Sequence, residues 1–130
     1  MGKGYFFAGD FGNEKVIVKV RLDIISFEED ETKICYSPAL DLSGYGIDEE
    51  AAKKSFEISL EEFLRYTTNK NTLIEELKKL GWEVKGRKNN RIFKPPYLDQ
   101  LFQNREYLSD IVRYKNFSRT TRDINIPAMA

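Results

Sequence analysis

Hydrophobic and charged residues alternate along residues 15–25, KVIVKVRLDII. Every second side chain is apolar, and this period of two predicts a β-strand with one buried face. Residues 32–37, TKICYS, predict a second strand. The charged residues 28–31, EEDE, lie between the two runs, so we expect a tight connection and an antiparallel hairpin.

The chain is expected to turn sharply after this hairpin. Pro38 has no amide hydrogen for a strand ladder, so the second strand should end there. Leu40, Leu42 and Tyr45 predict a short third strand, after which Gly46 would allow a bend. Asp48 then has the side chain and the position of a helix N-cap.

Two helices are expected next. The first has apolar or small residues at spacings of three and four, which predict a face packed on the core; they are Ala52, Phe56, Leu60, Phe63, Leu64 and Thr67. The second is expected over residues 71–80, with Gly81 as its stop. Residues 82–86, WEVKG, follow this helical crossover, so we expect a strand that joins the sheet beside the first strand.

The last third of the chain gives weaker patterns. Residues 85–90, KGRKNN, predict a basic loop, residues 91–94 a brief extended piece, and Pro95-Pro96 a rigid spacer. One helix is expected over residues 97–114. Residues 117–128 predict a final strand, whose place in the sheet the sequence leaves open.

These elements together predict an α+β fold, in which a helix packs on an antiparallel sheet. A length of 130 residues with 41% hydrophobic content is typical of one domain with its own core. We divide the chain into an N-terminal segment (1–14), a core (15–86) and an extension that packs on the same domain (87–130).

The composition excludes several kinds of chemistry. The chain has no histidine, which removes Ser-His-Asp and Cys-His nucleophilic systems and the usual zinc and non-haem iron ligand sets. Cys35 is the single cysteine, so neither an intrachain disulfide nor a multi-cysteine zinc site can form. We interpret Cys35 as a packing residue. No cofactor is expected.

The sequence predicts neither a signal peptide nor a membrane-spanning helix. The N-terminal residues MGKGYFFAGDFGNE lack a long apolar run with a cleavage site, and no stretch approaches about 20 apolar residues. The expected location is the cytoplasm.

Charge is divided unevenly along the chain, although the formal net charge is zero. Residues 28–62 contain eleven acidic and three basic side chains, whereas residues 85–122 contain ten basic and three acidic ones. An acidic first half and a basic second half indicate either self-complementary packing or two different partners.

The glycine-containing turn, Gly44-Tyr45-Gly46, does not predict a phosphate site. Three carboxylates follow it at the helix start and would repel phosphate, and neither standard nucleotide-binding glycine motif is present. Asp23, Asp41 and Asp48 could instead hold Mg²⁺ as in a nuclease. A solvated strand face, a turn and an N-cap explain these three residues fully, so we expect no catalytic or metal site.

One stretch resembles a known family. The string from Cys35 to Gly46, CYSPALDLSGYG, is followed by Asp48-Glu49-Glu50-Ala51-Ala52 and Phe56, and this order is similar to that of the HicB-like antitoxins. The resemblance covers roughly residues 16–84, and the ending Ile124-Asn125-Ile126-Pro127-Ala128 is similar to that of stand-alone members.

The resemblance implies a partial RNase H-like βββαβ core without catalysis. It also implies a small basic HicA-type mRNA interferase as the partner, which such proteins neutralise by covering its RNA-binding face. Many members carry a separate DNA-binding segment; here Pro95-Pro96 interrupts the candidate region, and no helix-turn-helix pattern follows.

Two functional hypotheses, and a third of lesser weight, follow. The first is a non-enzymatic antitoxin-type protein whose acidic residues Glu28, Glu29, Asp30 and Glu31 bind a basic toxin. The second is a nucleic-acid-binding regulator that uses Lys85, Arg87, Lys88, Arg91 and Lys94, with Phe93 and Tyr97 available for stacking. The third is self-association through a sheet or helix face, so a homodimer is left open.

Overall fold

A computed structural model of the chain describes residues 5–8, 16–87 and 90–127. It has the expected α+β architecture: one large antiparallel sheet, four helices and a separate small hairpin among the described residues. No helix in these ranges is long and apolar enough to cross a membrane.

The large sheet is built around β2 (Val16–Glu29). On one side of β2, β7 (Phe117–Pro127) pairs from Ile17 to Phe27. The other side is shared in tandem by β1 (Tyr5–Ala8), which pairs with residues 16–19, and β3 (Thr32–Ser37), which pairs with residues 25–29. β4 (Leu42–Gly46) lies outside β3. The final strand, whose place the sequence left open, therefore lies beside the first predicted strand. β1 was not among the predicted strands.

The β2–β3 hairpin is confirmed, with a tighter turn than expected. β2 continues through Glu29, so only Asp30 and Glu31 form the loop. Both residues have positive φ, 52° and 65°, as a two-residue hairpin turn of type I′ requires. The predicted first strand began at Lys15, which lies outside the described residues.

Helix α1 (Glu49–Asn69) begins at Asp48, as predicted. The Asp48 carboxylate accepts a hydrogen bond from the Ala51 backbone N–H at 2.8 Å, and Glu49 and Glu50 lie in the first turn, where acidic side chains stabilise a helix. The helix packs along β4, the outermost strand on this side of the sheet.

Gly44 and Gly46 permit this close packing, which corrects the expected role of Gly46. A Cβ on Gly44 would lie 2.1 Å from the Phe56 backbone nitrogen, and a Cβ on Gly46 would lie 2.5 Å from the Ala51 Cβ. The described glycines with positive φ are Gly81 and Gly86, so no left-handed bend occurs at Gly46. The absence of side chains at Gly44 and Gly46 therefore allows the helix to approach the strand.

Helix α2 (Leu73–Lys79) ends as predicted at Gly81, which has a φ of 99°. The amide of Gly81 donates to the Lys78 carbonyl and that of Trp82 to the Leu77 carbonyl, which is the Schellman pattern.

The strand expected at residues 82–86 forms, but it does not join the large sheet. β5 (Glu83–Lys85) pairs with β6 (Ile92–Lys94) in a separate two-stranded sheet. β7 offers β2 an eleven-residue partner, whereas β5 has three residues and a near neighbour in sequence with which a hairpin closes at low entropic cost. Gly86, with a φ of 89°, begins the turn of this hairpin.

The single helix expected over residues 97–114 is two helices, α3 (Leu98–Asn104) and α4 (Glu106–Tyr114). Arg105 separates them in an extended conformation (φ −129°, ψ 115°). Its guanidinium group lies in a polar cluster beneath the helices, so the break allows Arg105 to reach contacts that a helical backbone would not offer.

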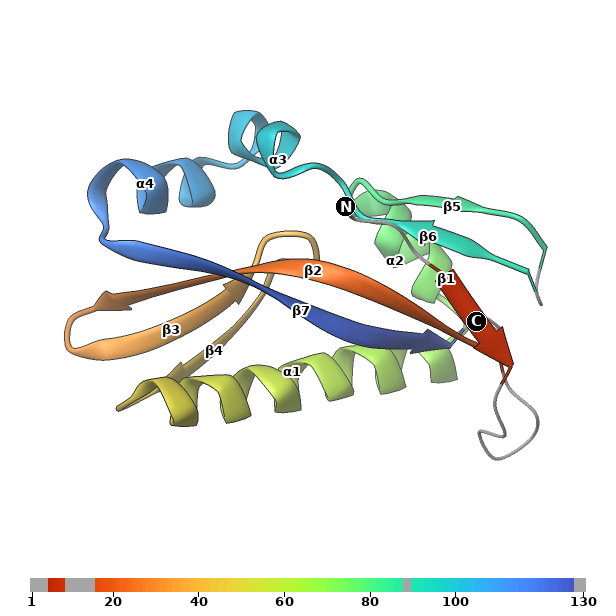
Figure 1. Cartoon of the computed structure of the whole chain (residues 1–130), viewed down its shortest axis with the longest axis horizontal. Coiled ribbons are helices and arrows are strands. Elements are labelled where there is room, and N and C mark those ends of the chain that lie inside the picture. Colours follow the sequence, from red (N-terminus) through yellow and green to blue (C-terminus); the bar gives the residue numbers. More distant parts are fainter. Residues whose placement is uncertain (1–4, 9–15, 88–89, 128–130) are drawn as a thin grey trace.

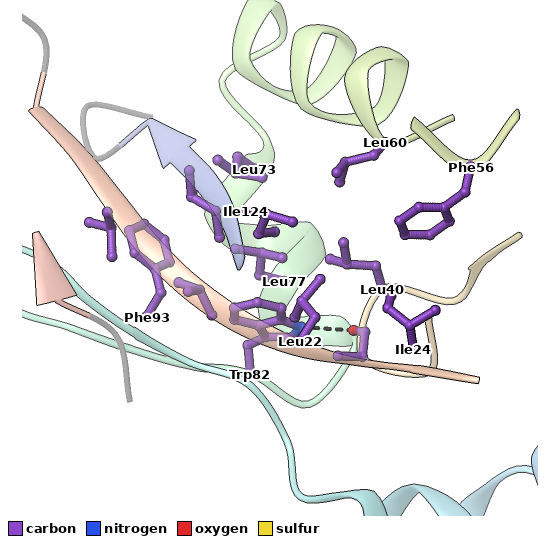
Figure 2. Close-up of a cluster of buried hydrophobic side chains, with 14 of the residues drawn as sticks. Leu22, Ile24, Leu40, Phe56, Leu60, Leu73, Leu77, Trp82, Phe93 and Ile124 are labelled. Atoms are coloured by element: carbon purple, nitrogen blue, oxygen red, sulfur yellow. Dashed lines mark hydrogen bonds between the residues drawn. The ribbon is translucent and has the colours of Figure 1, made fainter. Parts of the chain in front are cut away.

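Two hydrophobic clusters lie on opposite faces of the sheet. The face toward α1 and α2 carries the predicted alternating residues of β2, with Phe56, Leu77 and Trp82 among their neighbours; Figure 2 shows this cluster. The Trp82 indole N–H donates to the Ala39 carbonyl at 2.8 Å, which joins the β3–β4 loop to the start of β5 (Figure 2).

The opposite face is covered by α3 and α4 only over the half near the β2–β3 turn (Figure 1). There Ile25 and Phe27 of β2 pack against Leu108 and Ile111. The other half of this face carries Arg21 and Asp23, so one face of β2 is apolar from Val18 to Ile24 and the opposite face is apolar only at Ile25 and Phe27.

Candidate functional site

The predicted toxin-binding residues lie at one end of the molecule, where β2 turns into β3 (Figure 1). Glu28, Asp30 and Glu31 are exposed, and Glu29 is partly buried. Glu28 accepts from the Lys33 ammonium at 2.7 Å, and Glu29 pairs with Lys115 at 3.5 Å. The structure therefore brings the four residues together but leaves only part of their charge available.

The start of α1 adds acidic residues to the same end. β4 pairs Gly46 with Lys33, so the chain enters α1 close to the hairpin. The pKa of Lys33 is raised, chiefly by its hydrogen bond with Glu28 and further by the charge of Glu49. We call Asp30, Glu31, Glu49 and Glu50 the acidic end; within the described ranges these four exposed carboxylates form no ion pair.

The predicted nucleic-acid-binding residues lie at the other end, on the β5–β6 hairpin (Figure 1). Lys85 and Arg87 are exposed. The Arg91 guanidinium donates to the Gly86 carbonyl at 3.2 Å, and Lys94 pairs with Glu83 at 3.9 Å. Lys88 lies outside the described residues.

The aromatic part of the nucleic-acid hypothesis is half wrong. Phe93 is fully buried in the cluster beneath α2, because β6 turns it toward the body of the protein, so it cannot stack on a base. Tyr97 is 62% exposed, and the Lys94 ammonium lies 5.4 Å from its ring centroid.

A cleft of about 920 Å³ lies between the two ends, on the half of the sheet that α3 and α4 do not cover. Its floor includes Arg21, Asp23 and Arg119, and its rim is formed by Pro95, Pro96, Leu98 and their neighbours. The floor is made of cross-strand ion pairs: Arg21 with Asp123 at 3.3 Å, and Asp23 with Arg119 at 3.2 Å.

The polar cluster around Arg105 was not found by sequence reasoning. Tyr36 donates its hydroxyl to Asp41 at 2.7 Å, while Arg105 donates to the Pro38 carbonyl and to the Tyr36 hydroxyl oxygen. Burial, and then the bond to Asp41, raise the pKa of Tyr36, which Arg105 partly offsets. The cluster fixes the β3–β4 loop to α3 and α4, and no local signal links residues 69 positions apart.

The carboxylates considered for a metal site are engaged separately. Asp23 pairs with Arg119, Asp41 accepts from Tyr36, and Asp48 caps α1. In the part of the chain that the structure describes, no group of three or more potential ligands is placed to hold a metal ion. Cys35 is buried at 4% exposure, as its interpretation as a packing residue predicts, and burial raises the pKa of its thiol.

Comparison with known proteins adds no relative. No protein-family model, curated protein or solved structure matches this chain.

Proposed function

We propose that this protein is a non-enzymatic, HicB-like binding protein that neutralises a small, basic, RNA-cleaving toxin of the HicA type. The observation that carries the proposal is the acidic end: four exposed carboxylates from the β2–β3 turn and the start of α1. A cationic RNA-binding surface is complementary to such a cluster, and the attraction accelerates association.

The positions of these carboxylates support a binding role. Asp30 and Glu31 both have positive φ in a turn that favours asparagine or aspartate at its first position and glycine at its second. Glu31 therefore occupies the glycine position at a conformational cost, and binding to a basic partner would account for it. The order hairpin, third strand and capped helix is the one expected for the first four elements of a HicB-like core, whereas the strand after the helices, β5, lies in a separate sheet.

The other half of the proposal is that the protein performs no chemistry of its own. The three carboxylates that could have formed a nuclease site each have a structural partner, and Cys35 is buried. Inhibition by steric cover requires only a complementary surface.

The proposal is tested by capture from an extract of the native organism. Tagged protein is washed at low and at high salt, and bound protein and RNA are both identified. We expect to recover a small basic protein at a one-to-one ratio. On its own this partner should cleave RNA, and the cleavage should stop when this protein is added. A partner that does not cleave RNA, or no partner at all, would overturn the proposal.

The alternative is a nucleic-acid-binding regulator, supported by the exposed Lys85 and Arg87 on the β5–β6 hairpin and by Tyr97 nearby. Contacts with phosphates would make binding strongly salt-dependent. RNA or DNA released by the high-salt wash without a protein partner would support it, provided that a Lys85→Ala, Arg87→Ala variant no longer captures the nucleic acid. Retention by that variant would exclude these residues.

A further inference from the structure

The two outer strands of the large sheet, β4 and β7, differ in whether the backbone groups on their outer edges have hydrogen-bond partners. On β4, the Ser55 hydroxyl accepts from the Tyr45 amide at 3.0 Å, and the Ser59 hydroxyl donates to the Ser43 carbonyl at 3.2 Å. Helix α1 thus supplies partners for backbone groups of this strand. An edge whose backbone groups already have partners does not readily add another strand.

β7 has no such cover. It pairs with β2 on one side over eleven residues, and no described element pairs with its other side. Its side chains from Ser118 to Thr121 are exposed, as are Asp123 and Asn125. A long, uncovered edge strand presents a row of amide and carbonyl groups to a further strand.

We propose that β7 pairs with β7 of a second copy of this chain, antiparallel, with the two-fold axis at Thr121. In a regular antiparallel pair about such an axis, one residue faces its own counterpart, and the other pairs follow from it. With Thr121 at the axis, Arg119 faces Asp123 of the second copy, and Asp123 faces its Arg119.

The charges on β7 favour this register over the registers centred on neighbouring residues. A centre at Arg119, Arg122 or Asp123 would place identical charges directly opposite each other, which is destabilising in a sheet. A centre at Thr120 would place Arg119 opposite Thr121 and form no cross-strand ion pair. Among the registers centred on residues 119–123, only that at Thr121 makes two pairs of opposite charge.

These pairs extend ion pairs that already exist within each chain. Asp23 pairs with Arg119 at 3.2 Å, and Arg21 pairs with Asp123 at 3.3 Å, all on one face of the sheet. In the dimer, the charges across the four central strands would alternate as Asp23, Arg119, then Asp123 and Arg21 of the second copy, with Asp23 diagonal to Arg119 because it faces Thr121. Arg119 would lie between two carboxylates, those of Asp23 in its own chain and Asp123 of the second copy, whereas Arg21 would lie beside one, that of Asp123.

The ends of the molecule are complementary in the same arrangement. β7 begins beside Phe27, near the acidic end, and finishes beside Ile17, at the end that carries the basic β5–β6 hairpin (Figure 1). An antiparallel pairing places the acidic end of one copy alongside the basic end of the other. This complementarity favours a second copy over an unrelated strand as the occupant.

Disulfide trapping tests the register. In the full-length protein, Thr121→Cys would place two thiols in directly opposed positions, with Cα atoms about 4.5–5.5 Å apart, within the range of a disulfide. Ser118→Cys is the matched control, because its two copies would be about 20 Å apart in this register. The native Cys35 is buried, so wild-type protein gives the background.

We expect mild oxidation to convert Thr121→Cys to a covalent dimer at least ten times faster than Ser118→Cys. Equal rates, or faster trapping at Ser118→Cys, would overturn the register. Sedimentation then tests the dimer without cysteines: Thr121→Lys places two ammonium groups at the axis, while Asp23 faces residue 121 within the chain and tolerates the lysine. Loss of the dimer with retained folding is expected, and a monomeric wild-type protein would contradict the proposal.

Discussion

Gly44 and Gly46 set the distance between helix α1 and strand β4. A Cβ on Gly44 would lie 2.1 Å from the Phe56 backbone nitrogen, which is too close. Backbone atoms cannot move aside as a flexible side chain can. The sequence drew attention to this turn, but it suggested backbone freedom as the reason. Only the packing of α1 reveals that the missing side chain matters.

Gly44→Ala is expected to lower the free energy of unfolding by about 1–3 kcal/mol, because the added methyl group forces α1 away from β4. Urea unfolding monitored by circular dichroism measures the change. Ser43→Ala, at the neighbouring position on β4, is the control and should cost far less. Equal stability of wild type and Gly44→Ala would show that α1 can shift freely.

The phenol of Tyr36 makes the stability of the folded protein fall at alkaline pH. Burial and the bond to Asp41 raise the pKa of Tyr36, so the folded chain keeps the phenolic proton where the unfolded chain releases it, above about pH 10. The folded state binds more protons there, and its stability falls as pH rises beyond that value. Below pH 10 the contribution is fully present.

Tyr36→Phe should therefore cost about 1 kcal/mol at pH 8, where it removes a hydrogen bond, and the loss should shrink above pH 10. Urea unfolding at pH 8, 10 and 11 makes the comparison. Tyr114→Phe is the control, because that ring is 76% exposed. A gap between wild type and Tyr36→Phe that does not narrow with pH would refute the role of this phenol.

Among the helices and strands, the features that depend on a few neighbouring residues were predicted correctly from the sequence. The alternation in β2, the cap at Asp48 and the Schellman stop at Gly81 each arise within a few residues, and each was predicted correctly. The pairing of β7 with β2 joins residues about one hundred positions apart, so no short window could reveal it. The break at Arg105 likewise depends on Tyr36 and Pro38, far away in sequence.

The candidate sites show the same division. The acidic turn was predicted from the amino-acid sequence, but its ion pairs with Lys33 and Lys115 depend on the fold. Phe93 was assigned to an exposed stacking role because it lies among basic residues; the pairing of β6 with β5 buries it instead. The charge of each patch can be predicted from its residues, but which of its side chains remain exposed depends on how the elements pack.

The β2–β3 turn offers a prediction at this scale. Glu31 has a φ of 65°, which costs an L-residue about 1–2 kcal/mol and glycine almost nothing. Glu31→Gly should therefore raise the free energy of unfolding by about 1 kcal/mol, measured by thermal and urea unfolding. Glu31→Ala removes the same charge and keeps the strain, so an equal gain from Glu31→Ala would attribute the effect to charge.

At the scale of the whole molecule, the charges form a dipole. Exposed carboxylates of the turn and of α1 lie at one end, and Lys85 and Arg87 lie at the other, with the large sheet between them (Figure 1). A formal net charge of zero conceals this arrangement. Under the two proposals made above, a basic protein would bind the acidic end, and a second copy would pair along β7 in the antiparallel direction.

The role proposed for the acidic end is tested most directly by the rate at which the captured basic partner associates with this protein. Asp30→Asn with Glu31→Gln removes two charges from the acidic end and keeps side chains of similar size in the turn. Glu75→Gln with Glu76→Gln, on α2, removes two charges elsewhere. Association is measured by stopped flow at low and at high salt.

We expect the Asp30→Asn, Glu31→Gln variant to associate several-fold more slowly than wild type at low salt, and we expect the difference to disappear at high salt, where charges are screened. The α2 variant should associate at close to the wild-type rate. An unchanged rate for the turn variant, or equal slowing in both variants, would contradict the claim that the acidic end receives the partner.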